Sequence, residues 1–182
     1  MKKVFYFILA IIPASAFAQT AETRTVDAFT GVKSGALVTI ELKSGSPCAV
    51  VLEGDADGVK SITTEVKNGT LIIGQEGHSK SGPVKVIVTI SDLKSIDLSG
   101  AAALKGESTL VMDSLRIEGS GGSQLELSVT ATNAIVDLSG ASSLHLCGTT
   151  KKLTAELAGA AALRSGCLEA QDVNITASGA SN

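Results

Sequence analysis

Four acidic residues recur at one place in a repeated segment, three residues before a glycine: Asp97, Glu118, Asp137 and Glu156. If the segments stack like neighbouring strands, about 4.8 Å apart, the carboxylates form a column on the outer face. Such a column could bind divalent cations such as Ca²⁺, or a cationic partner. The other interpretation is a solvated face that keeps the protein soluble. The sequence favours this second interpretation, because Ca²⁺ takes about 6–8 oxygens and each segment supplies one carboxylate.

Three cysteines and two histidines are the other residues that could react or bind a metal. Cys147 and Cys167 are 20 residues apart, the length of one segment, which makes them candidates for a disulfide between neighbouring segments. The alternative is that both are small buried apolar residues, and Cys48 is left over either way. His78 and His145 belong to no Cys/His cluster of the kind that binds zinc. We therefore predict no metal centre, no cofactor and no catalytic residues.

The acidic residues lie in segments whose glycines follow one another at steps of 21, 19, 19 and 20 residues: Gly100, Gly121, Gly140, Gly159 and Gly179. A step near 20 residues is typical of stacked coils rather than of a globular core. Apolar and polar residues alternate around each glycine, as in a strand with one buried face. We therefore predict an all-β protein, a β-solenoid with coils of about 20 residues, in which the glycine turns the corner.

The first eighteen residues are predicted to be a signal peptide. Lys2 and Lys3 precede a short apolar stretch, and Ala16-Phe17-Ala18 has the small-x-small pattern of a cleavage site. The apolar stretch is too short to span a bilayer comfortably, so we predict no membrane span. We expect an exported protein that resides in the periplasm, on the outer cell surface or outside the cell.

Composition narrows the class of partner. Without Lys2 and Lys3 the chain has 13 basic and 18 acidic residues, a net charge of −5. This charge argues against nucleic acid or an anionic membrane as the partner. Aromatic residues make up 3% of the chain and Trp is absent, so the sugar platforms of a polysaccharide-degrading enzyme are missing. We therefore predict that the protein is not an enzyme.

Motifs outside the acidic segments form an ordered series. Phe29-x-Gly31-Val32-x-Ser34-Gly35 is followed by Asn68-Gly69-x-Leu71-x-Ile73, by Val84-x-Val86-x-Val88-Thr89, and then by the Leu-Ser-Gly-Ala segments. Together these motifs resemble the head GIN domain family, secreted proteins common in Bacteroidetes that are often labelled putative autotransporter adhesins. The resemblance covers nearly the whole mature chain. It implies a right-handed parallel β-helix and implies little about activity.

These observations predict an exported, non-catalytic β-solenoid that acts as an adhesin-like, scaffold or binding protein for a surface glycan or protein. Residues 19–90 would form irregular coils and residues 91–182 the regular Ser-Gly-Ala coils of one head GIN domain. Two alternatives stay open. One is a carbohydrate-active enzyme on a β-helix fold, and the other is a self-assembling structural subunit that stacks through an open terminal coil.

Overall fold

The computed structural model describes residues 20–77 and 84–182, so the predicted signal peptide over residues 1–18, and His78, lie outside the described residues. The elements are β1 (Thr20–Arg24), β2 (Gly31–Ser34), β3 (Val38–Ser44), β4 (Ala49–Gly54), α1 (Ala56–Ser61), β5 (Ile62–Lys67), β6 (Thr70–Gln75), β7 (Val84–Ile90), β8 (Ser95–Leu98), β9 (Ala103–Gly106), β10 (Leu110–Gly119), β11 (Gln124–Leu138), β12 (Ser143–Leu157), β13 (Ala162–Arg164) and β14 (Leu168–Ala177). In this part of the chain, α1 is the single helix, and no helix is long and apolar enough to cross a membrane.

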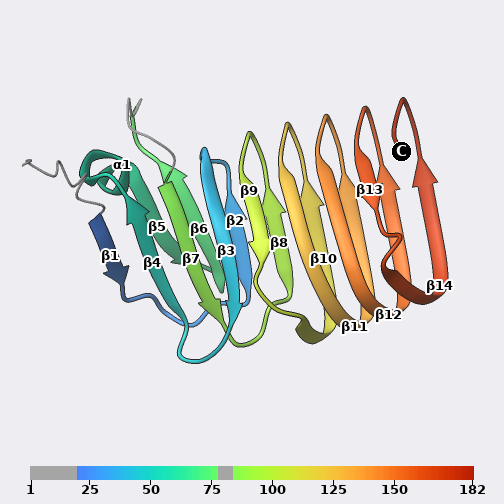
Figure 1. Ribbon diagram of the computed structural model, residues 1–182, viewed down its shortest axis with the longest axis horizontal. Coiled ribbons are helices and arrows are strands. Elements are labelled where there is room, and N and C mark those ends of the chain that lie inside the picture. The colour runs from blue at the N-terminus through green and yellow to red at the C-terminus, as the bar shows by residue number, and fades with distance from the viewer. Residues whose placement is uncertain (1–19, 78–83) are drawn as a thin grey trace, which may run out of the picture.

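The strands of the described residues form one 14-stranded mixed sheet. Its main path runs β1-β4-β7-β3-β9-β11-β10-β8-β2-β6-β5, and β12 continues it by pairing with β11, β13 and β14. The sheet has two limbs, and the long strands β11 and β12 run through both. In one limb, β9 pairs with the first residues of β11, and β13 with the first residues of β12. In the other limb, β10 pairs with the later residues of β11, β11 with those of β12, and β14 with those of β12. The sheet therefore curls over on itself as a half-barrel, with turns along one long edge (Figure 1).

The prediction of a regular right-handed parallel β-helix or solenoid is wrong, because the sheet is mixed. β1 pairs antiparallel with β4, β4 with β7, and β5 with β6. The β5–β6 pair is a hairpin, since Asn68 and Gly69 have φ values of 51° and 73° and turn the chain back directly. Between β4 and β5, α1 begins where the Asp55 carboxylate accepts a hydrogen bond from the Gly58 N–H at 2.6 Å. Such local reversals are incompatible with continuous winding in one direction.

The segments rich in Ser, Gly and Ala form the other end of the sheet, where neighbours are parallel and in register. Leu125 pairs with Leu144, and Ile117 pairs with Ile96 and Val136. These side chains point to the inside of the curled sheet and are at most 3% exposed. Burying each aliphatic side chain of this size contributes roughly 1.5–3 kcal/mol, so these apolar rows hold the two limbs together.

Two of the turns show why glycine is needed. Gly121 and Gly140 have φ values of 68° and 69°, and the Ala141 N–H donates to the Gly121 carbonyl at 2.7 Å. A Cβ atom on Gly140 would lie 2.9 Å from that same carbonyl oxygen. The backbone of one turn therefore rests directly on the backbone of the turn before it, and any side chain at the glycine would separate them.

We predict that Gly140→Ala lowers the free energy of unfolding by about 2–3 kcal/mol, because it adds left-handed backbone strain to a backbone clash. Urea denaturation followed by circular dichroism measures the change. The matched control is Gly166→Ala, since a Cβ atom there meets nothing within 4 Å and φ is not in the left-handed region. Equal stability of the two variants would contradict the proposed stacking of turns.

Candidate binding groove

A shallow groove of about 530 Å³ lies on the outer face of the limb formed by β8, β10, β11, β12 and β14. Its lining includes all four predicted acidic residues, together with Arg116, Ser120 and Ser139. The sheet register brings the acidic residues together: Asp97 pairs with Glu118, Glu118 with Asp137, and Asp137 with Glu156. The column ends at Thr176 on one side and at Lys33, which pairs with Asp97, on the other.

Cationic side chains neutralise much of this acidic column. The Lys33 Nζ lies 2.5 Å from an Asp97 carboxylate oxygen. The Arg116 guanidinium bridges two neighbours, with its Nε 2.5 Å from Glu118 and its Nη2 2.5 Å from Asp137. The hydrogen bond to Asp97 raises the pKa of Lys33 above its usual value, and that to Glu118, reinforced by the charge of Asp137, raises the pKa of Arg116. Both side chains therefore remain charged under physiological conditions.

The ion pairs bear on whether the acidic column binds a cation or is a solvated face. A cation that entered it would compete with Arg116 for Glu118 and Asp137 and with Lys33 for Asp97. The geometry therefore offers no ready cage of oxygens for Ca²⁺. Glu156 differs from the other three carboxylates, because it is exposed and has no ion-pair partner among residues 20–77 and 84–182. It is the acidic group of the column that can contact an incoming ligand without breaking a protein contact.

Hydroxyl groups line the groove beside the carboxylates. Ser120 and Ser139 line it one residue before their turn glycines, and Ser99 holds the equivalent position in the preceding segment, outside the lining. The Ser99 hydroxyl donates to the Ser34 carbonyl at 3.4 Å, whereas the hydroxyls of Ser120 and Ser139 make no hydrogen bond with any other described residue. Two free hydroxyls and one free carboxylate, from Glu156, therefore face the same open groove. Such groups bind a ligand through hydrogen bonds rather than through apolar contact.

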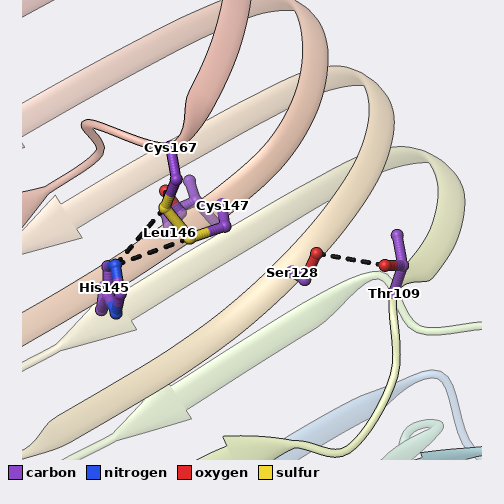
Figure 2. The surroundings of a disulfide bond; sticks show 6 residues. All are labelled: Thr109, Ser128, His145, Leu146, Cys147 and Cys167. Carbon is purple, nitrogen blue, oxygen red and sulfur yellow. Dashed lines mark hydrogen bonds between the residues drawn. A yellow bond between two sulfur atoms is a disulfide. The ribbon is translucent and has the colours of Figure 1, made fainter.

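The predicted cysteine pair lies away from the groove, on the other limb. Cys147 and Cys167 are joined by a disulfide, and their Cα atoms are 4.7 Å apart (Figure 2). Cys48 is half-buried and is the free cysteine of the described residues. His145, from the same strand as Cys147, lies beside both sulfur atoms.

Sequence reasoning missed the cationic partners of the column and the histidine beside the disulfide. Alternation along a strand carries part of the missing signal, because residues i and i+2 share a face. This rule places Arg116 on the side of Glu118, and His145 on the side of Cys147. It could not have found Lys33, because the contact of Lys33 with Asp97 depends on which strands become neighbours.

Residues 28–182 match the family model described as "Putative auto-transporter adhesin, head GIN domain". The chain belongs to this family. The resemblance that the motifs indicated is therefore confirmed. A comparison with curated proteins found no match.

Solved structures show the same fold. A putative adhesin from Bacteroides fragilis NCTC 9343 is 20% identical, with a TM-score of 0.83 over 90% of this chain and 78% of that one. A putative adhesin from Parabacteroides distasonis ATCC 8503 is 15% identical, with a TM-score of 0.68 over 90% and 79%. A putative lipid binding protein from that same strain is 11% identical, with a TM-score of 0.64 over 87% and 78%. The curled mixed sheet of this chain is thus shared with these three solved structures.

We predict that Arg116→Gln lowers the free energy of unfolding by about 0.5–1 kcal/mol at low salt, because Glu118 and Asp137 lose the cation between them. The loss should shrink in about 1 M NaCl, where charges are screened over roughly 3 Å. Thermal denaturation at the two salt concentrations measures it. Arg164→Gln is the control, because exposed Arg164 forms no ion pair with other described residues. A salt-independent loss would contradict an electrostatic role for Arg116.

Proposed function

We propose that this head GIN domain is an exported, non-catalytic binding protein whose groove recognises a hydroxyl-rich ligand, a surface glycan. The supporting observation is the open groove in which Ser120, Ser139 and Glu156 present polar side-chain groups that form no hydrogen bond or ion pair with other described residues. Sugar hydroxyls pair well with such groups, because each can donate to a carboxylate and exchange hydrogen bonds with a serine. Adhesin names among the structural neighbours agree with a binding role outside the cytoplasm.

The groove suits a polar ligand better than a lipid chain. One structural neighbour is named a putative lipid binding protein. In this chain, however, the exposed groups of the groove are carboxylates, serines and Arg116. Leu138 and Leu157 also line it but are at most 5% exposed, so they offer little apolar surface. An acyl chain placed there would remove water from charged groups without replacing their hydrogen bonds.

The carbohydrate-active alternative requires a carboxylic acid that is held protonated by burial, next to a second carboxylate. The side chains of Asp97, Glu118 and Asp137 are 33%, 43% and 31% exposed, and each is paired with a cation. Glu156 is also exposed. None of these four carboxyl groups is buried as the acid of such an enzyme is, which favours binding over hydrolysis.

We predict that the protein binds members of a glycan array, and that Ser120→Ala with Ser139→Ala weakens the strongest interaction by at least about tenfold. Each lost hydrogen bond costs about 0.5–1.5 kcal/mol, so two together reach this range. Ser114→Ala is the control, because Ser114 is exposed on β10 outside the groove. Absence of any glycan binding, or equal binding by the double variant, would refute the groove assignment. Oligosaccharide products released from a bound polysaccharide would refute the non-catalytic role.

Self-association is a second candidate function, favoured by strand β14. Among the described strands β14 pairs with β12 alone, so one of its edges carries free backbone groups. Its side chains Val173 and Ile175 are 55% and 48% exposed, whereas their register partners on β12, Leu153 and Ala155, are buried. A strand from a second copy would cover this edge and its apolar side chains.

We predict that the protein forms dimers or larger species at high concentration and that Ile175→Lys shifts it to the monomer, because a charge on the edge strand opposes strand addition. Size-exclusion chromatography with light scattering measures the mass. Val111→Lys is the control, since Val111 is 77% exposed but lies on β10, away from that edge. A monomeric wild-type protein at the highest concentration tested would rule this function out.

A further inference from the structure

His145, Cys147 and Cys167 form a compact cluster of metal-binding atoms on the limb that does not carry the groove. Their potential ligand atoms all lie within 4.8 Å of one another. The His145 Nε2 is 3.5 Å from the Cys147 sulfur and 3.4 Å from the Cys167 sulfur (Figure 2). In its disulfide form the cluster cannot bind a metal through thiolates, because both sulfur atoms are bonded to each other.

We infer that reduction of this disulfide creates a three-ligand site for a thiophilic cation, which Zn²⁺ represents. Two thiolates and one imidazole are ligands that Zn²⁺ prefers, and three protein ligands leave a fourth position for water. This site is independent of the proposed glycan groove, which is built from the opposite ends of β11 and β12.

The distances fit such a site. Zn–S bonds of about 2.3 Å and Zn–N bonds of about 2.0–2.1 Å in a tetrahedral arrangement require N···S separations of roughly 3.6 Å and S···S separations of roughly 3.8 Å. The two observed N···S separations of 3.4 and 3.5 Å already match. Once the S–S bond is broken, the two sulfur atoms move apart by rotation about their Cα–Cβ bonds. The imidazole needs little movement.

The backbone holds the three ligands in place. His145 and Cys147 are two residues apart on β12 and therefore share its outer face. Cys167 is presented by a tight turn, in which the Leu168 N–H donates to the Ser165 carbonyl at 2.9 Å. The Gly148 N–H donates to the Cys167 carbonyl at 3.0 Å and joins this turn to β12. None of these bonds involves the disulfide, so we expect the arrangement to persist after reduction.

Access to the cluster is open, because His145 and Cys167 are exposed and Cys147 is half-buried. A dithiol reductant supplies two electrons and two protons, so the disulfide becomes two thiols while the dithiol becomes a cyclic disulfide. Zn²⁺ then displaces the two thiol protons and accepts the lone pair of the His145 Nε2, which faces both sulfur atoms. The bound ion replaces the covalent link between β12 and the segment before β14. The cluster would thus be closed to metal under oxidising conditions and open under reducing ones.

The test uses the mature protein with Cys48→Ala, which removes the one other thiol of the described residues. We expect the phosphine-reduced protein to bind one Zn²⁺ per chain in competition with a chromophoric chelator, and the oxidised protein to bind none. With Co²⁺ as the probe, the reduced protein should show the near-ultraviolet absorption of a thiolate–cobalt bond. Zn²⁺ should also raise the melting temperature of the reduced protein, because it restores a link between neighbouring strands.

A variant of His145 distinguishes a three-ligand site from metal binding by the two thiols alone. His145→Gln should weaken Zn²⁺ binding to the reduced protein by at least about tenfold, as loss of even a supporting group does at metal sites. Thr149→Ala, an exposed substitution on the same strand, should leave it unchanged. The proposal is overturned if the reduced protein binds no Zn²⁺, if the oxidised protein binds it equally well, or if His145→Gln binds as tightly as the parent protein.

Discussion

The in-register pairing of parallel backbones from β10 to β14 is the interaction on which the groove, the turns and the cysteine cluster all depend. Backbone hydrogen bonds between neighbouring strands maintain it. Arg116 on β10 pairs with Ile135 on β11, for example, and Glu156 on β12 pairs with Thr176 on β14. Because side chains on a strand alternate between faces, a shift of one residue would exchange the inner apolar rows with the outer polar ones. Burial of the inner rows therefore sets the position of every outer side chain.

The same register imposes an electrostatic cost on the outer face. Like charges that face each other on neighbouring strands destabilise a sheet, and the acidic column places several carboxylates in that relation. Arg116 relieves the contact between Glu118 and Asp137, since its planar guanidinium binds both carboxylates at once. Lys33 and Arg116 thus neutralise part of the acidic column, and Glu156 is left without an ion pair among the described residues.

Sequence periodicity predicted strands with one buried face and the turn glycines, because both are local signals, but it predicted the wrong fold, a regular solenoid in place of a curled mixed sheet. It located Gly140 in the turn that the structure describes, and the alternation around the turn glycines agrees with the burial of Leu125 and Leu144. It failed in the amino-terminal half, where α1 spans only six residues, too few for a helical period, and where β4 runs antiparallel to its neighbours. The ion pair of Lys33 with Asp97 could not be predicted either, because the two residues are 64 positions apart in the sequence. They become neighbours only because β2 pairs with β8.

The turn that stacks Gly140 on Gly121 has a further consequence for the dimensions of the molecule. β11 and β12 pair at a constant offset of 19 residues, and each such unit carries its own inner leucine, outer carboxylate and turn glycine. A unit inserted between β11 and β12 could form the same backbone hydrogen bonds with each of them. The sheet could therefore grow by one strand spacing, about 4.8 Å, without change to either end. The length of the outer surface is therefore set by the number of units.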